Sequence, residues 1–211
     1  IAALTTGVLG GLSSEQVAGL TTEQLAALGT LRAFSSQQLT ALTTSQIASL
    51  GPAAIAALTT FQLSALSGEQ QNAIDTQQIA ALTTTQAVAL STQLLAWLTT
   101  DQVAALETTD IAVLNASQAG ALSLEQFAAL STGQINAINT RVLPTLSTAA
   151  VASFTTAQLV AVRALNALSS QQIAALTTDQ VMALDTSLLA TLATRHVSAL
   201  TGAHLQALDT Q

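Results

Sequence analysis

The sequence contains no cysteine, lysine or tyrosine, and arginine supplies all four of its basic residues. Without cysteine the chain cannot form a disulfide, a zinc-thiolate site or a thiol nucleophile, and without lysine it cannot form a Schiff base. Only 7% of the residues are charged and the net charge is -7. The chain therefore lacks the basic surface that neutralises phosphates, and we expect neither nucleic-acid binding nor an enzyme.

Long hydrophobic runs are also missing, although 50% of the residues are hydrophobic. One of the longest runs, 53–58, has six residues, whereas a membrane-spanning helix needs about 20. The first residues, IAALTTGVLGGL, have no basic flank and no cleavage-like end, so they do not resemble a signal peptide. We therefore expect no membrane span.

What the sequence does contain is an eight-residue repeat with the consensus [ST]-[ST]-x-Q-[ILV]-A-A-L. Typical octads are TTEQLAAL at 21–28 and SSQQLTAL at 35–42, and 24 octads cover nearly the whole chain. The pattern predicts a single repeat array over residues 1–211. Two six-residue units, 29–34 and 163–168, lack positions 1 and 2. We interpret them as deletions that kink the coil, while a marker of a longer period is the alternative.

Each octad position predicts a structural role. Position 1 is Ser, Thr, Asp or Asn in 21 of 24 octads and position 4 is Gln in 15, the pattern of a capping box at a helix N-terminus. Pro52 falls at the first helical position, where proline is tolerated, and Pro144 falls at position 6, where it removes a hydrogen bond. Each octad is therefore expected to form one helix of about six residues.

Helices this short are unstable alone and require neighbours. Positions 1, 4, 5 and 8 fall on one arc of the helix, and positions 2, 3 and 6 point away. We predict an all-α solenoid of short capped helices, one per octad, in which each coil contacts its neighbours. One continuous helix is disfavoured because its apolar stripe would drift by about 80° per repeat. A β-helix is disfavoured because the apolar spacing is i, i+3 and not alternating.

The termini carry a further expectation. The sequence opens at position 5 of an octad and stops at position 3, whereas a solenoid needs capped ends for solubility. We expect either a stretch of a longer array or a subunit whose ends stack on copies of itself.

The histidines are the first candidate site. His196 and His204 both occupy position 4 of adjacent octads. Stacked coils could bring the two rings together as metal ligands, but no carboxylate completes such a set. We favour a capping role in place of Gln, and we assign no metal, cofactor or catalytic residue.

Other unusual residues receive structural interpretations. Trp97 replaces the alanine of position 7 and is expected to cover a local groove, and Phe61 at position 3 is expected to be exposed. Glu107 and Asp110 are a close acidic pair. We favour a place beside a helix N-terminus, where negative charge is favourable, over an acid–base pair.

Two resemblances follow from the octads. TTEQLAAL is similar to the first helix of the TAL-effector repeat, but that repeat's second helix and base-reading loop are absent. TTDQVAAL at 99–106 and TTDQVMAL at 177–184 resemble L-T-T-x-Q-[IV]-x-A-L tracts of large bacterial secreted or surface proteins, often labelled adhesins or haem-utilisation proteins. This resemblance implies an extracellular, structural or adhesive role, and the sequence shows no haem ligand set.

These observations favour an extracellular spacer or filament-forming segment. Its partners would be copies of itself or neighbouring repeats of a longer chain. The first alternative is a binding module, or adhesin, that uses the variable positions 2, 3 and 6 to contact a protein or glycan. A minor alternative is an ice-binding array of the position-2 threonines.

Overall fold

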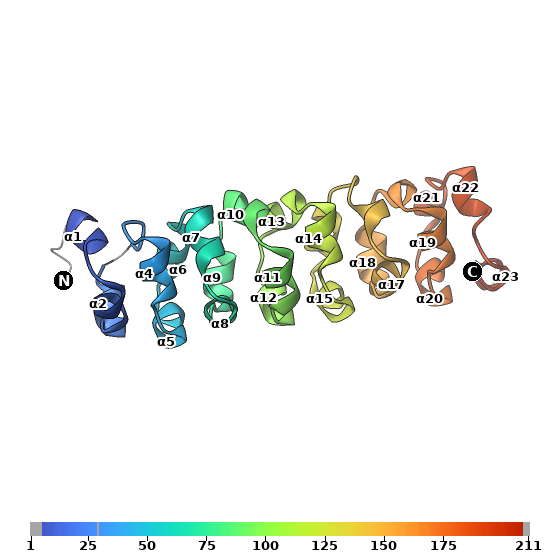
Figure 1. Ribbon diagram of the computed structural model, residues 1–211. Coiled ribbons are helices and arrows are strands. Elements are labelled where there is room, and N and C mark those ends of the chain that lie inside the picture. The colour runs from blue at the N-terminus through green and yellow to red at the C-terminus, as the bar shows by residue number, and fades with distance from the viewer. Residues whose placement is uncertain (1–5, 29, 209–211) are drawn as a thin grey trace. The chain divides into compact units, whose positions relative to one another are not determined.

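The computed structural model describes residues 6–28 and 30–208. In these residues all regular structure is helical and no strand occurs, which confirms the predicted solenoid of short helices (Figure 1). The first part of the chain contains α1 (Thr6–Gly10), α2 (Ser14–Ala18), α3 (Thr22–Ala26), α4 (Ser36–Thr40), α5 (Thr44–Ala48), α6 (Pro52–Ala56), α7 (Thr60–Ala65), α8 (Gly68–Asn72), α9 (Thr76–Ala80), α10 (Thr84–Ala89), α11 (Thr92–Trp97), α12 (Thr100–Ala104) and α13 (Thr108–Val113). The second part contains α14 (Ala116–Gly120), α15 (Leu124–Ala129), α16 (Thr132–Ala137), η1 (Leu143–Thr145), α17 (Thr148–Ala152), α18 (Thr156–Ala161), η2 (Leu165–Ala167), α19 (Ser170–Ala174), α20 (Thr178–Met182), α21 (Thr186–Leu189), α22 (Thr194–Val197) and α23 (Gly202–Leu208).

The helices begin where the sequence predicts capping boxes. At α10 the Thr83 hydroxyl accepts from the backbone N–H of Gln86, and the Gln86 side chain accepts from the backbone N–H of Thr83 at 2.9 Å. Both donors lack a partner inside the helix, so the box satisfies them. The helix ends after Ala89, because its C-cap residue Leu90 has an extended ψ of 133°. Side-chain capping recurs in most of the octads that the structure describes, with Gly51 before α6 as one exception, and it keeps the helices near the predicted length.

The chain divides into two compact units, one up to Asp110 and one from Ile111, and each is described by itself. In each unit a helix packs against the helix three repeat units before it. The first unit contains the stacks α4–α7–α10, α5–α8–α11 and α6–α9–α12. The second contains α15–α17–α19–α22 and α16–α18–α20–α23. Three repeat units therefore form one coil (Figure 1).

The core of each unit consists of octad positions 5 and 8. Ile47 and Ile55 at position 5 are fully buried, and Leu50 and Leu58 at position 8 are only 4% exposed. Position 1 was predicted to share one arc of the helix with positions 4, 5 and 8, but its side chain, as at Thr43, is exposed. The N-cap side chain turns back to the amides of its own helix, and this geometry holds it at the surface.

The irregular units keep the core although they lose the α-helix. In 163–168 the turn η2 forms, and Leu165 and Leu168 are buried. Residues 30–34 form a turn with Leu31 and Phe34 buried, while Gly29 lies outside the described residues. These two pairs occupy positions 5 and 8, which confirms that positions 1 and 2 are the missing ones. Whether these units kink the coil stays a prediction.

The two prolines lie as predicted. Pro52 is the first residue of α6. Pro144 lies in η1, where a 3₁₀ turn replaces the α-helix of the other octads. The missing N–H of proline breaks the i to i-4 pattern at that octad.

Candidate functional site

The position-4 glutamine is the residue that ties one coil to the next. Gln78 in α9 is fully buried. Its Oε1 accepts from the N–H of Asp75, the N-cap of its own helix, at 2.9 Å. Its Nε2 donates to the carbonyls of Ile47 at 2.9 Å and Leu50 at 2.6 Å. Leu50 precedes Gly51, the N-cap of α6, and α9 packs on α6. One side chain therefore satisfies backbone groups in two successive coils.

The same bridge recurs in both units, and we call its members the glutamine ladder. They are Gln38, Gln46, Gln62, Gln70, Gln78, Gln86 and Gln102 in the first unit and Gln158, Gln172 and Gln180 in the second. Each Nε2 donates to the residue that precedes the N-cap of the helix three repeat units earlier. The separation is 28 residues, as from Gln86 to Leu58, or 26 where a six-residue unit intervenes, as from Gln172 to Leu146.

The ladder explains why position 4 is Gln and never Glu. Either residue completes a capping box, but only the amide can also donate to a carbonyl. The carbonyls it reaches lie at helix C-termini, where no intrahelical partner exists, and a buried carbonyl without a partner is costly. Sequence reasoning predicted the capping role alone. The absence of Glu at position 4 was the signal that could have revealed the second role.

Besides the first octad, six octads of the described residues have neither Gln nor His at position 4. These positions hold Ala54, Leu94, Asp110, Val142, Ala150 and Leu188. Five of these side chains are apolar, and none of the five can donate to the preceding coil. The ladder is therefore interrupted, not continuous.

Asp110 is the one charged residue at position 4. It lies in the first turn of α13 after Glu107, which confirms the predicted place of the acidic pair at a helix N-terminus. The sequence did not reveal that Asp110 is only 1% exposed, nor that its Oδ2 has no hydrogen-bond partner among the described residues. Burial raises the pKa of this carboxyl, the hydrogen bond from the Glu107 backbone lowers it, and the Glu107 charge raises it further.

The two histidines continue the ladder in the second unit. Nδ1 of His196 accepts from the N–H of Ala193 at 3.2 Å, and Nε2 lies 2.9 Å from the carbonyl oxygen of Leu168. His204 repeats this arrangement with Thr201 and Leu176. The neutral tautomer with the proton on Nε2 satisfies both contacts. The predicted capping role is confirmed, and each ring already uses both nitrogens.

Trp97 covers Gly68, as the groove-covering prediction required. A Cβ atom on Gly68 would lie 2.1 Å from the indole ring, so only glycine fits beneath it. The indole is 45% exposed and borders an open surface pocket with Glu69 and Asn72. Phe61 is 75% exposed, as predicted. Both aromatic side chains are accessible to a partner.

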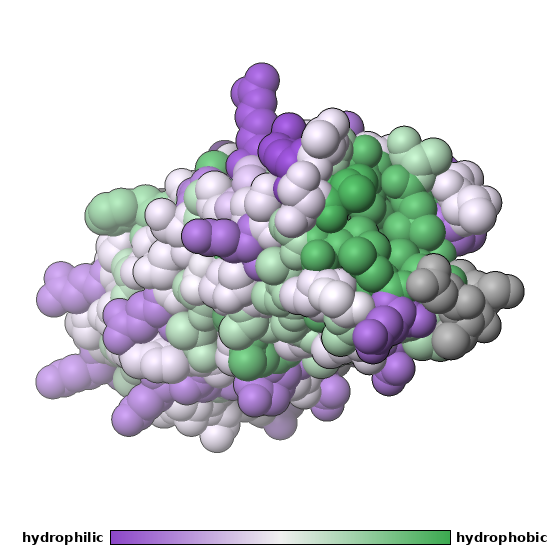
Figure 2. Space-filling model, turned by 90° about the vertical axis from the view of Figure 1, so that its right-hand side faces the viewer, coloured by the Kyte–Doolittle hydropathy of each residue, from purple (hydrophilic) through white to green (hydrophobic). Residues whose placement is uncertain are grey.

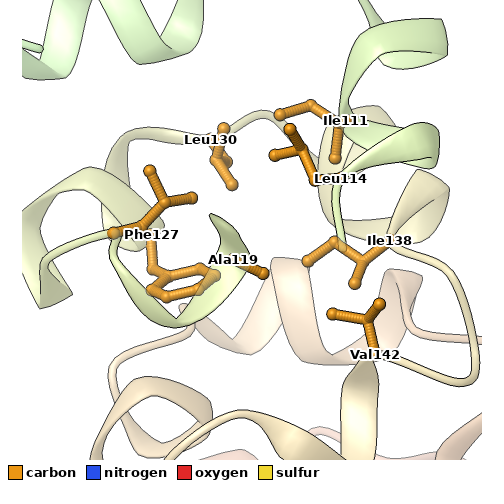
Figure 3. Close-up of a pocket in the computed structure, with 8 residues that line it drawn as sticks. Ile111, Leu114, Ala119, Phe127, Leu130, Ile138 and Val142 are labelled. Carbon is orange, nitrogen blue, oxygen red and sulfur yellow. The ribbon is translucent and has the colours of Figure 1, made fainter. Parts of the chain in front are cut away.

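Phe127, Leu130, Ile138 and Val142 are among the residues that line an apolar space in the second unit (Figure 3). It arises where Ala119 occupies position 5 in place of a larger aliphatic residue. Its volume is about 10 Å³, too small for more than one water molecule. It is a packing defect of the core and does not form a ligand site.

These features define the class of protein: an α-solenoid of octapeptide repeats whose coils are joined by side-chain amides. Residues 1–30, 72–108 and 103–140 match the sequence model of the ALTTAQ repeat. That motif spans the end of one octad and the start of the next, as in ALTTTQ at 81–86. No curated protein matches the chain. In the described residues, no helix is long and apolar enough to cross a membrane, and no three His, Cys, Asp or Glu side chains form a metal-binding group.

Proposed function

We propose that this chain is a structural solenoid that serves as a spacer or filament-forming segment of a bacterial surface or secreted protein. The glutamine ladder is the observation that carries this proposal. Each bridge joins equivalent atoms of successive coils, so octads can be added without a new kind of contact. Such an array sets distance by its number of repeats.

The composition supports an extracellular setting. A chain without cysteine has no thiol to oxidise. The resemblance to repeat tracts of large secreted and surface proteins points the same way.

The spacer role is tested by measuring length against repeat number. Variants that lack or duplicate the 24 residues 75–98, three whole octads, should change the maximum dimension in X-ray scattering by the rise of one coil in each case. Antibody labelling of intact cells of the source organism tests the location. A dimension that does not change with repeat number, or labelling only after cells are lysed, would count against the proposal.

A binding module is the second candidate, and the Trp97 surface favours it. The exposed indole stands beside the Glu69 carboxylate and the Asn72 amide, a combination that binds sugars or cations in other proteins. A glycan array probed with the wild-type chain and with Trp97→Ala tests this role. Phe61→Ala is the matched control, because it removes an exposed aromatic elsewhere.

A further inference from the structure

Three of the four arginines of the chain belong to the second unit. Arg141, Arg163 and Arg195 all occupy position 3 of their repeat units, and all three are exposed. The 11 acidic residues of the chain all lie outside residues 126–178. Figure 2 shows strongly hydrophilic side chains that project from a paler, weakly polar surface. A chain with a net charge of -7 therefore contains one stretch whose charge is positive.

A surface pocket brings two of these arginines to the same place. Its volume is about 200 Å³, and its lining includes Thr140, Leu143 and Arg163. Because Arg141 directly follows Thr140 in the chain, its backbone lies beside this pocket. The unit of Arg163 comes three repeat units after that of Arg141, and three repeat units form one coil. The two arginines therefore occupy the same octad position in successive coils.

The pocket opens where 3₁₀ turns replace two α-helices of the array. One wall belongs to the octad of η1 and another to the six-residue unit of η2. Because the unit 163–168 lacks positions 1 and 2, fewer residues fill the space between these coils than elsewhere. The apolar lining residues Ile135, Leu143 and Val162 are each at most 2% exposed. They offer little apolar surface to a ligand, so recognition depends on the polar rim.

The rim combines charged and neutral polar side chains. Arg163, the Asn136 amide and the Thr140 hydroxyl all line the pocket and are exposed. Nη2 of Arg195 donates to the carbonyl of Asn166 at 2.9 Å, in the same six-residue unit as Arg163. This contact uses one of the five N–H donors of the Arg195 guanidinium. We call the surface formed by Asn136, Thr140, Arg141, Arg163 and Arg195 the arginine face.

Acidic side chains of the described residues do not neutralise the arginine face, because none is hydrogen-bonded to it. Asp185 is the candidate by register, since its octad comes three repeat units after 163–168. Its carboxylate accepts from the Ser187 hydroxyl at 2.6 Å and from the Leu188 N–H at 2.8 Å. These hydrogen bonds lower the pKa of Asp185, and no arginine contributes to that lowering. The guanidinium groups are therefore available to an anion from outside the chain.

We propose that the arginine face binds an acidic polysaccharide, whose sulfate or carboxylate groups pair with guanidinium groups of successive coils. A guanidinium binds such an oxyanion through two parallel N–H···O bonds. The Asn136 amide and the Thr140 hydroxyl suit the hydroxyls of a sugar. A single-stranded nucleic acid fits less well, because it needs aromatic side chains for stacking, and none of the described residues that line the pocket is aromatic.

This site goes beyond the spacer role and lies in a different unit from the Trp97 surface. Isothermal titration calorimetry of the wild type should show binding of dextran sulfate or of polygalacturonate, and no binding of neutral dextran. The affinity should fall as salt is added, because exposed charges are screened. Arg163→Gln should weaken binding by about tenfold, the usual effect of losing a charge-assisted hydrogen bond. Arg163→Lys should fall between, because it keeps the charge but loses the planar fork.

Arg32→Gln is the matched control. Arg32 is exposed and lies in the other six-residue unit, 29–34, in the first unit of the chain. Its replacement removes the same charge, so binding should stay within about twofold of wild type. Equal losses in Arg32→Gln and Arg163→Gln would show attraction by overall charge alone and overturn the site.

The remaining outcomes also decide the proposal. Failure of both acidic polymers to bind, or equal binding of neutral dextran, overturns it. Inorganic sulfate that binds as tightly as the polymers, or tighter binding of single-stranded DNA or of vesicles with anionic lipid, overturns the polysaccharide as the ligand. Circular dichroism verifies that the variants fold. None of these results bears on the spacer role, which the repeat-number experiment tests through length.

Discussion

The side-chain amide of Gln78 lies 2.6 Å from the carbonyl oxygen of Leu50, a residue 28 positions earlier in the sequence. Oε1 of the same side chain accepts from the N–H of Asp75, the N-cap of α9. One glutamine therefore fixes both the start of a helix and the distance between two coils. Short helices that would melt alone are therefore held by a polar bond as well as by the leucine core.

Gln78→Glu should destabilise the coils around α9. Glu keeps the capping box but removes the donor and places a charge at a site with no exposed surface. The two carbonyls left without a donor and the buried charge should cost about 2–4 kcal/mol. Amide hydrogen exchange should show faster exchange in α6 and α9, because each coil contacts only its neighbours.

Gln16→Glu is the matched control for that prediction. It changes the same octad position and the same capping box, but Gln16 is exposed and donates to no described carbonyl. Its effect on the free energy of unfolding should be within about 0.5 kcal/mol. Equal losses in the two variants would show that capping alone, and not the bridge, governs stability.

His196→Gln should preserve the fold, whereas His196→Leu should not. Gln reproduces both contacts of the ring, to the Ala193 N–H and the Leu168 carbonyl. Leu leaves both groups unsatisfied in a buried site and should cost about 2 kcal/mol. Urea unfolding of the two variants measures the difference, and a leucine variant as stable as wild type would refute it.

Asp110→Asn should stabilise the protein at neutral pH. Burial raises the pKa of Asp110, so the folded state favours the protonated form. The stability linked to this carboxyl is present below the ordinary pKa of Asp and is lost as pH rises through the raised value. The advantage of the asparagine variant should therefore shrink as pH falls toward about 4.

Comparing the stability of the wild type and of Asp110→Asn at each pH removes the contribution of the other acidic residues. The pKa of Glu23 and of Glu125 is lowered, first by hydrogen bonds from their own backbone and then by the N-cap hydroxyls. Their contribution to stability is lost as pH falls, in the opposite direction, but equally in both proteins. An Asp110→Asn advantage that grows toward acid pH would contradict the assignment.

Gly68→Ala should displace the Trp97 indole, because the new Cβ would overlap the ring. Trp97 is the only tryptophan in the chain, so its fluorescence reports the displacement directly. We expect a red shift of the emission and a loss of about 1 kcal/mol. Gly120→Ala is the control, since a Cβ there meets nothing within 4 Å, and it should leave the emission unchanged.

The repeat unit and its boundaries could be predicted because they depend on local chemistry. Thr83 and Gln86 are three residues apart, and a capping box requires nothing beyond that spacing. The exposure of Phe61 and the lost helical hydrogen bond at Pro144 follow from helical periodicity and from the missing N–H in the same way. The all-α solenoid and the capping histidines were therefore accessible without coordinates.

The partner of each glutamine was not accessible, because Leu50 is distant from Gln78 in sequence and no local rule joins them. Only coil closure brings that carbonyl within hydrogen-bonding distance, and closure depends on packing between helices three repeat units apart. The buried carboxyl of Asp110 was missed for the same reason. The sequence by itself determined where each helix begins and ends, since those are contacts across three or four residues. The tertiary structure alone decided which carbonyls need a donor, since burial is a property of the assembled coils.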